Sequence, residues 1–187
     1  MIFKMIAPVI ALAALASAQT AQAQQQACVN PADLSDAVVY AMPIAYDAAR
    51  TACTNRLSKN GFMASKGDAF IAPYRTAQNN AWPGALRVIN AFAADNAKGA
   101  EGAAGADMGA IFGSMPENAL RPFVDAFVGQ MIAEEIKPAS CNKIERGLEL
   151  VSPLPVSNVG GLVTFIADLT DLKNPALCPA PATTTKK

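Results

Sequence analysis

The stretch NPADLSDAVVYAMPIAYDAARTAC, residues 30–53, contains the strongest helix signals in the chain. Asn30 is a favoured N-cap residue, Pro31 suits the first helical position, and Asp33 lies in the first turn, where the helix dipole stabilises a carboxylate. Apolar residues then recur at intervals of three and four, which predicts a helix that runs to about Ser58. The expected apolar stripe consists of Leu34, Val38, Ala41, Ala45, Ala48 and Ala52.

Pro43 lies inside this predicted helix. The apolar phase continues past it, and Pro43 falls on the polar side together with Asp36, Tyr40, Asp47 and Arg50. A proline in a helix interior removes one backbone hydrogen bond and crowds the preceding turn. Because the phase is unbroken, we expect a kink at Pro43 rather than the end of the helix.

The same helix limits how the four cysteines Cys28, Cys53, Cys141 and Cys178 can form two disulfides. Cys28 and Cys53 are 25 positions apart, which is roughly 35 Å along a helix, whereas bonded cysteines need Cα atoms within about 7 Å. That excludes 28–53 together with 141–178 and leaves two pairings. We favour 28–178 with 53–141 over 28–141 with 53–178, because the first ties the two ends of the domain together.

The N-terminus resembles a bacterial secretory signal peptide. Lys4 precedes an apolar run over residues 5–16, and Ala21-Gln22-Ala23 provides a small-residue cleavage site, with residues 16–18 as the second choice. We therefore expect cleavage after Ala23 and a periplasmic or secreted protein. Residues 24–178 would form one all-α domain, and the low-complexity residues 179–187 a disordered tail.

Five further helices are expected, at about residues 65–80, 83–97, 116–137, 141–151 and 159–172, so the prediction is a single-domain bundle of about six helices without strands. The glycine-rich residues 98–116 have three interpretations. A linker is favoured, because each glycine costs a helix about 1 kcal/mol. A packed surface of small residues is the second interpretation and membrane entry is the third.

Charge and composition exclude several classes of protein. The chain has 15 basic and 15 acidic residues, so no nucleic-acid partner is expected. It has no histidine, which argues against the common serine, cysteine and metal hydrolases, and the cysteines lack metal-ligand spacing. We expect no cofactor, no metal and no catalytic residue. Downstream of the signal peptide no apolar run approaches the length of a membrane span, so stable membrane insertion of the mature chain is not expected.

These observations favour a non-enzymatic binding or interaction module with an unknown protein partner. One alternative is a carboxylate-dependent cell-wall hydrolase built on Glu134 and Glu135, although neighbouring helix residues point in different directions. The other is a carrier of an apolar small ligand. Core packing is the simpler interpretation of the residues that would line such a carrier's pocket, which are Trp82, Phe92, Phe112, Phe123, Phe127, Met131 and Phe165.

Overall fold

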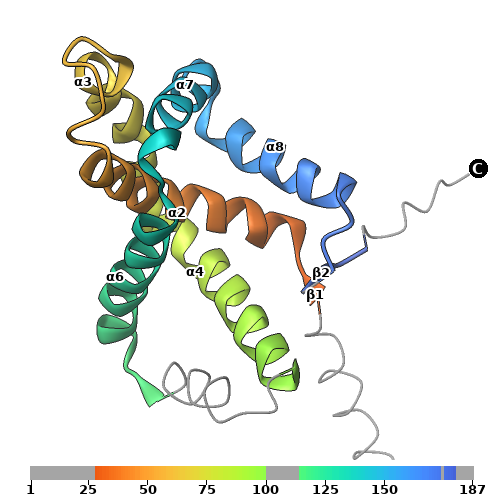
Figure 1. Ribbon diagram of the computed structural model, residues 1–187. Helices are drawn as coiled ribbons and strands as arrows, with labels where there is room; N and C mark the ends of the chain where they lie inside the picture. The colour runs from red at the N-terminus through yellow and green to blue at the C-terminus, as the bar shows by residue number, and fades with distance from the viewer. Residues whose placement is uncertain (1–27, 100–113, 174, 180–187) are drawn as a thin grey trace, which may run out of the picture.

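The computed structural model describes residues 28–99, 114–173 and 175–179. This part of the chain is mostly helical (Figure 1). Its elements are β1 (Cys28–Val29), α2 (Pro31–Ala52), α3 (Phe62–Ser65), α4 (Gly67–Gly99), α6 (Glu117–Glu135), the 3-10 turn η2 (Pro138–Ser140), α7 (Cys141–Val151), α8 (Val156–Leu169) and β2 (Ala176–Leu177). The predicted signal peptide, the C-terminal tail and most of the glycine-rich stretch, residues 100–113, lie outside the described residues.

Helix α2 lies at the centre of the described fold, and α4, α6 and α8 all pack against it. It begins as expected, with the Asn30 side chain accepting a hydrogen bond of 2.9 Å from the backbone N–H of Ala32. The helix continues through Pro43 without a break. Its buried residues are Val39, Tyr40, Pro43, Tyr46, Ala48 and Ala49.

This burial corrects the predicted phase of the stripe. Tyr40 and Pro43 were placed on the polar side but are buried, whereas Ala52 of the predicted stripe is exposed. The reason is that α2 is covered from several directions, so its buried surface is wider than one stripe. Its charged side chains reach solvent at the seams, where Asp33 and Asp47 pair with arginines of α4.

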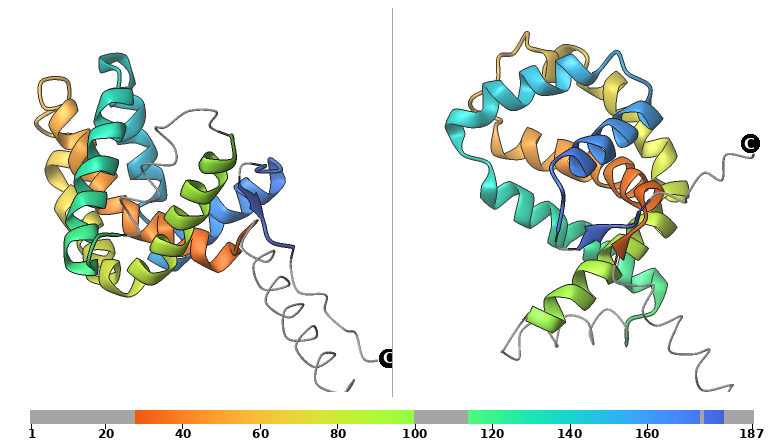
Figure 2. Two further views of the ribbon diagram at one scale, coloured as in Figure 1. Left: turned by 90° about the horizontal axis from the view of Figure 1, so that it is seen from below. Right: turned by 90° about the vertical axis from the view of Figure 1, so that its right-hand side faces the viewer.

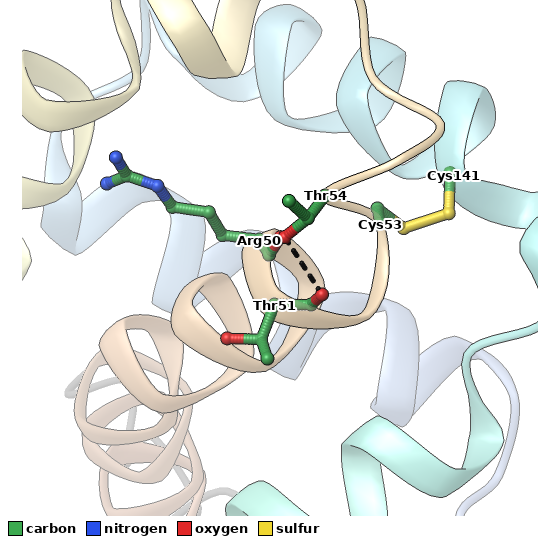
Figure 3. The surroundings of a disulfide bond; sticks show 5 residues. All are labelled: Arg50, Thr51, Cys53, Thr54 and Cys141. Carbon is green, nitrogen blue, oxygen red and sulfur yellow. Dashed lines mark hydrogen bonds between the residues drawn. A yellow bond between two sulfur atoms is a disulfide. The ribbon is translucent and has the colours of Figure 1, made fainter.

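Helix α2 ends at Ala52, earlier than the predicted Ser58. Cys53 is buried and bonded to Cys141 at the start of α7, as Figure 3 shows. The Thr54 hydroxyl donates to the carbonyl oxygens of Arg50, at 2.8 Å, and Thr51, at 3.0 Å. These side-chain hydrogen bonds help to satisfy carbonyl groups of the last turn of α2, which ends next to the disulfide.

Helix α4 joins two segments that were predicted as separate helices. It runs through Pro73 and Pro83, both of which are exposed. Helical spacing of the buried side chains continues across both prolines, and their packing outweighs the lost hydrogen bonds. The residues buried along α4 are Phe70, Ile71, Tyr74, Ala81, Trp82, Ala85 and Val88.

Helix α6 follows Pro116 as predicted, but its apolar face is divided. Leu120 and Val124 are buried against the core, whereas Phe123, Phe127 and Met131 are exposed. Two polar side chains of α6 make hydrogen bonds to other helices. Arg121 donates to Asn79 of α4 at 2.7 Å, and Asp125 accepts a hydrogen bond from Tyr40 of α2.

The two disulfides are Cys28–Cys178 and Cys53–Cys141, the pairing favoured above, with Cα separations of 4.9 and 5.6 Å. The first brings the two ends of the described chain together, and β1 and β2 form a short parallel pair beside it (Figure 1). This pair corrects the expectation that the chain has no strands. The N–H of Cys178 donates to the carbonyl oxygen of Val29 at 2.9 Å.

Helix α7 has the predicted bounds, but α8 starts three residues earlier than expected and ends at Leu169 rather than 172. Pro155 caps its start, and its carbonyl oxygen accepts from Asn158 and Val159. Asp171 has a positive φ of 53°, which no helix continues through. Helix α8 lies on the outside of the fold, on the near side in Figure 2, right.

Candidate functional site

One face of α8 anchors the helix on α2. Val159, Gly160 and Thr164 are buried there. A Cβ atom at Gly160 would lie 2.9 Å from the backbone oxygen of Ser35, so only glycine lets the two helices approach so closely. The Thr164 hydroxyl donates to the carbonyl oxygen of Gly160 at 3.0 Å. These contacts fix which side of α8 faces outward.

The opposite side is an exposed apolar surface, which we call the outer α8 face and define as Leu162, Phe165, Ile166 and Leu169. These side chains are 43, 57, 49 and 68% exposed. Their spacing of three and four residues puts them on one side of the helix. A contiguous apolar surface in solvent marks a binding site more often than a single exposed leucine does.

The composition of α8 strengthens this interpretation. Its sequence VSNVGGLVTFIADL contains a single charged residue, Asp168. A helix with so few charged residues is normally enclosed, yet here α2 covers only the inner side. Leu150 at the end of α7 and Leu154 in the following loop are also exposed.

Among the described residues, no single helix combines the length and the hydropathy of a membrane span. Two consecutive segments, Pro138–Val151 and Val156–Leu169, meet the criterion only when they are taken together, and they are bent by 117° relative to each other.

A second notable constellation joins α2, α4 and α6. The Tyr40 hydroxyl donates to Asp125, and the Arg121 guanidinium lies 5.4 Å from the centre of the Tyr40 ring and 5.8 Å from that of Trp82. Burial, followed by the Asp125 carboxylate, raises the pKa of Tyr40. A phenol with a raised pKa keeps its proton, so Tyr40 is unsuited to act as a base. The arrangement is suited to hold the three helices together.

An open groove of about 480 Å³ lies beside this joint, between α2, α4 and α6. The Arg75–Asp47 ion pair, 2.7 Å long, is at its edge. A smaller cleft of about 330 Å³ adjoins the Cys28–Cys178 bond, where Arg87 donates two hydrogen bonds to Asp33. Small and polar side chains predominate in both, which does not match the Phe- and Met-lined cavity expected of an apolar carrier.

The structure separates the residues that the sequence analysis singled out. Glu134 and Glu135 are both exposed at the end of α6, and Glu134 accepts a hydrogen bond from Gln130. Glu135 lines an open groove of about 470 Å³ beside apolar side chains of α6 and α7, and Glu134 is not among the residues that line it, so the two carboxylates do not face each other across this groove. In the aromatic and methionine set, Trp82 belongs to the core, and Phe112 lies outside the described residues. The remaining members, Phe92, Phe123, Phe127, Met131 and Phe165, are exposed.

Sequence reasoning included Phe165 in that set but missed Leu162, Ile166 and Leu169. The available signal was the near absence of charge along residues 156–169 together with the glycine pair Gly160-Gly161. A search for similar proteins returned no match to this chain among family models, curated proteins or solved structures.

Proposed function

We propose that this protein is an exported, non-enzymatic binding module of the bacterial envelope, and that it binds its partner through the outer α8 face. The observation that carries the proposal is the exposure of four large apolar side chains in one row on a helix whose inner side is already packed. Keeping such a row in water gains nothing for folding, whereas covering it on binding is favourable.

The proposed compartment follows from the disulfides and the N-terminal sequence. One disulfide joins Cys28 to Cys178 and the other links the end of α2 to α7, and disulfides persist in oxidising compartments. The signal-like residues 1–23 are consistent with export from a bacterial cytoplasm.

Photo-crosslinking in intact cells tests the proposal. A photoreactive amino acid replaces Leu162 in one variant and the exposed Ala72 of α4 in a matched control. We expect a discrete adduct from position 162 and none from position 72. An absence of adducts from position 162, or equal labelling at both positions, would contradict the assignment of α8 as the binding surface.

A further inference from the structure

The two disulfides differ in how accessible they are to solvent. Cys53 and Cys141 are each 1% exposed, and their bond lies between the end of α2 and the start of α7 (Figure 3). Cys28 and Cys178 are only half-buried, and both line the cleft of about 330 Å³ beside the N-terminal end of α2. Exposed disulfides are generally the ones that thiols reduce, and they include regulatory and catalytic bonds. The Cys28–Cys178 bond is therefore the one that a thiol from solvent can reach.

The walls of this cleft leave room for an attacking thiol. Its volume lies at the lower end of the range for small-molecule sites, roughly 300–1,000 Å³. Its longest side chain, Arg87, donates two hydrogen bonds to Asp33, so this cation is already paired. The other lining residues, apart from the two cysteines, have short side chains: Val29, Asn30, Val88, Asn90, Ala91 and Ala94. A cysteine at the tip of a peptide loop matches this size and this neutral lining.

Within the described residues, few contacts besides the disulfide hold the segment that ends in Cys178. We call this segment the C-terminal strap and define it as Lys173 and residues 175–178. Its strand β2 pairs with β1 over two residues, and the N–H of Cys178 donates to the carbonyl oxygen of Val29 at 2.9 Å. Pro175 is the one buried residue among the described strap residues. A two-stranded pair is at best marginally stable in water, so the covalent bond supplies most of the hold on the strap.

From these observations we propose that the Cys28–Cys178 bond is a thiol-exchange site, which a dithiol protein reduces, and that reduction releases the C-terminal strap. One thiolate of the dithiol attacks a sulfur of the bond and displaces the other sulfur as a thiolate, so a mixed disulfide forms. The second thiolate of the dithiol then attacks the mixed disulfide and frees the remaining cysteine. Two electrons pass to this protein, the dithiol becomes a disulfide, and its two protons end on Cys28 and Cys178.

Reduction at this site leaves the helical framework in place. The Cys53–Cys141 bond stays closed, because a thiol reaches a buried bond only after the core opens. Helix α8 stays on α2 through its buried residues Val159 and Thr164. Cys178 lines the cleft and belongs to the strap, so release of the strap widens the cleft.

Differential alkylation tests the order of reduction. The disulfide-bonded chain is treated with dithiothreitol, quenched with an alkylating reagent at intervals and mapped by peptide mass. We expect Cys28 and Cys178 to be labelled at least about tenfold faster than Cys53 and Cys141, with the helical circular dichroism retained after the first bond opens. Equal rates, the reverse order, or loss of helix together with the first bond would overturn the proposal.

Thioredoxin serves as the protein dithiol. In its reduced form it should open the same bond and leave Cys53–Cys141 intact. A thioredoxin variant that lacks its second cysteine cannot complete the exchange, so it should stay attached to Cys28 or Cys178 as a mixed disulfide. The lack of any adduct, or an adduct at Cys53 or Cys141, would overturn the assignment of this bond to a protein dithiol.

A bulky side chain in the cleft tests the route of attack. Ala94 and Ala72 are both exposed alanines on α4, but of the two only Ala94 lines the cleft. Ala94→Trp should slow the reduction of the Cys28–Cys178 bond by thioredoxin several-fold, whereas Ala72→Trp should not change it. Equal rates for the two variants would overturn the cleft as the route.

Trypsin cleavage after Lys173 reports whether the strap is released. In the oxidised chain Lys173 pairs with Asp171 at 3.1 Å. Reduction of the Cys28–Cys178 bond, or the double change Cys28→Ala with Cys178→Ala, should speed this cleavage at least about fivefold. Cleavage after Lys59, in the loop between α2 and α3, is the control and should not change. An unchanged rate at Lys173 would overturn the release of the strap. Because no residue of the outer α8 face lines this cleft, that failure would leave the proposed binding function in place.

Discussion

Helices α2 and α8 lie where their compositions would not predict: the more charged helix is at the centre of the fold and the more apolar one is on the outside. Helix α2 carries Asp33, Asp36, Asp47 and Arg50 and is surrounded by three other helices. Helix α8 carries one charge and lies on the outside with its most apolar side in solvent. The difference teaches that burial here follows the geometry of contact rather than average hydropathy. Part of the apolar surface of α8 therefore contributes nothing to the core of this fold.

The charges of α2 are tolerated at the centre because they emerge between the covering helices. Arg50 pairs with Asp68 at 3.0 Å, and Asp47 and Asp33 pair with Arg75 and Arg87 at 2.7 Å each. Exposed pairs of this kind contribute at most about 1 kcal/mol each, so packing of the apolar and tyrosine side chains remains the main source of stability.

The largest expected effect comes from a cavity in α2. Tyr46 is buried against Phe70, with ring centres 6.4 Å apart. Tyr46→Ala should lower the free energy of unfolding by about 3–5 kcal/mol. Phe165→Ala on α8, measured by the same denaturant titration at low protein concentration, should cost less than about 1 kcal/mol. Similar losses for the two variants would remove the contrast between the helices.

Loss of the disulfide at the end of α2 should follow. Replacing both Cys53 and Cys141 by alanine should cost about 2–4 kcal/mol. The Cys28–Cys178 bond closes a longer loop than the Cys53–Cys141 bond, so in the entropy model its loss should cost more. However, Cys28 and Cys178 are only half-buried, whereas Cys53 and Cys141 are 1% exposed. We therefore expect the first double variant to be the less stable in thermal unfolding. The reverse order would mean that loop length outweighs packing.

The adjacent glycines of α8 should respond with opposite signs. Gly160→Ala forces a methyl group against the Ser35 backbone and should destabilise the monomer by about 1–3 kcal/mol. Gly161→Ala enters open space and should stabilise it by up to about 1 kcal/mol through helix propensity. Chemical denaturation at low concentration distinguishes them, and equal signs would show that the inner and outer sides of α8 are assigned wrongly.

The smallest effect concerns the tyrosines, two of which belong to α2. Burial raises the pKa of Tyr40, Tyr46 and Tyr74. Because the folded state then holds these protons more tightly, stability is fully present below the ordinary tyrosine pKa near 10 and falls as pH rises above it. At pH 10.5 the loss should be below about 1 kcal/mol per tyrosine. Absorbance of tyrosinate in the folded protein should rise above pH 10 rather than at it; a step near pH 10 in the folded protein would contradict the burial.

Local signals predicted much of the helical framework. Asn30 and Pro31 placed the start of α2, Pro116 that of α6, and the length of α2 excluded a bond between Cys28 and Cys53. These signals depend on neighbouring residues or on simple distance, which a single sequence contains. The predicted start of a new helix at Pro83 was wrong, because the apolar stripe of α4 continues across this proline. The energy of that packing depends on α2, which the local sequence does not specify.

The candidate site was harder to predict for the same reason. Leu162, Ile166 and Leu169 have the spacing of a core stripe, and nothing local shows that they face outward. The close contact between Gly160 and Ser35 places the Gly160 side of α8 against α2, so the opposite side, with Leu162, Ile166 and Leu169, faces outward. Periodicity identifies an apolar face but does not say which of two such faces the fold covers.

The central claim is that the outer α8 face serves binding and not folding. The most direct test is the free energy of unfolding of a triple variant, Leu162→Gln, Phe165→Gln and Leu169→Gln, measured at sub-micromolar concentration, where each chain is alone. The account predicts a value within about 1 kcal/mol of the parent, because all three side chains are already in solvent. A loss of several kcal/mol would show that these side chains are part of the core in solution and would contradict the claim.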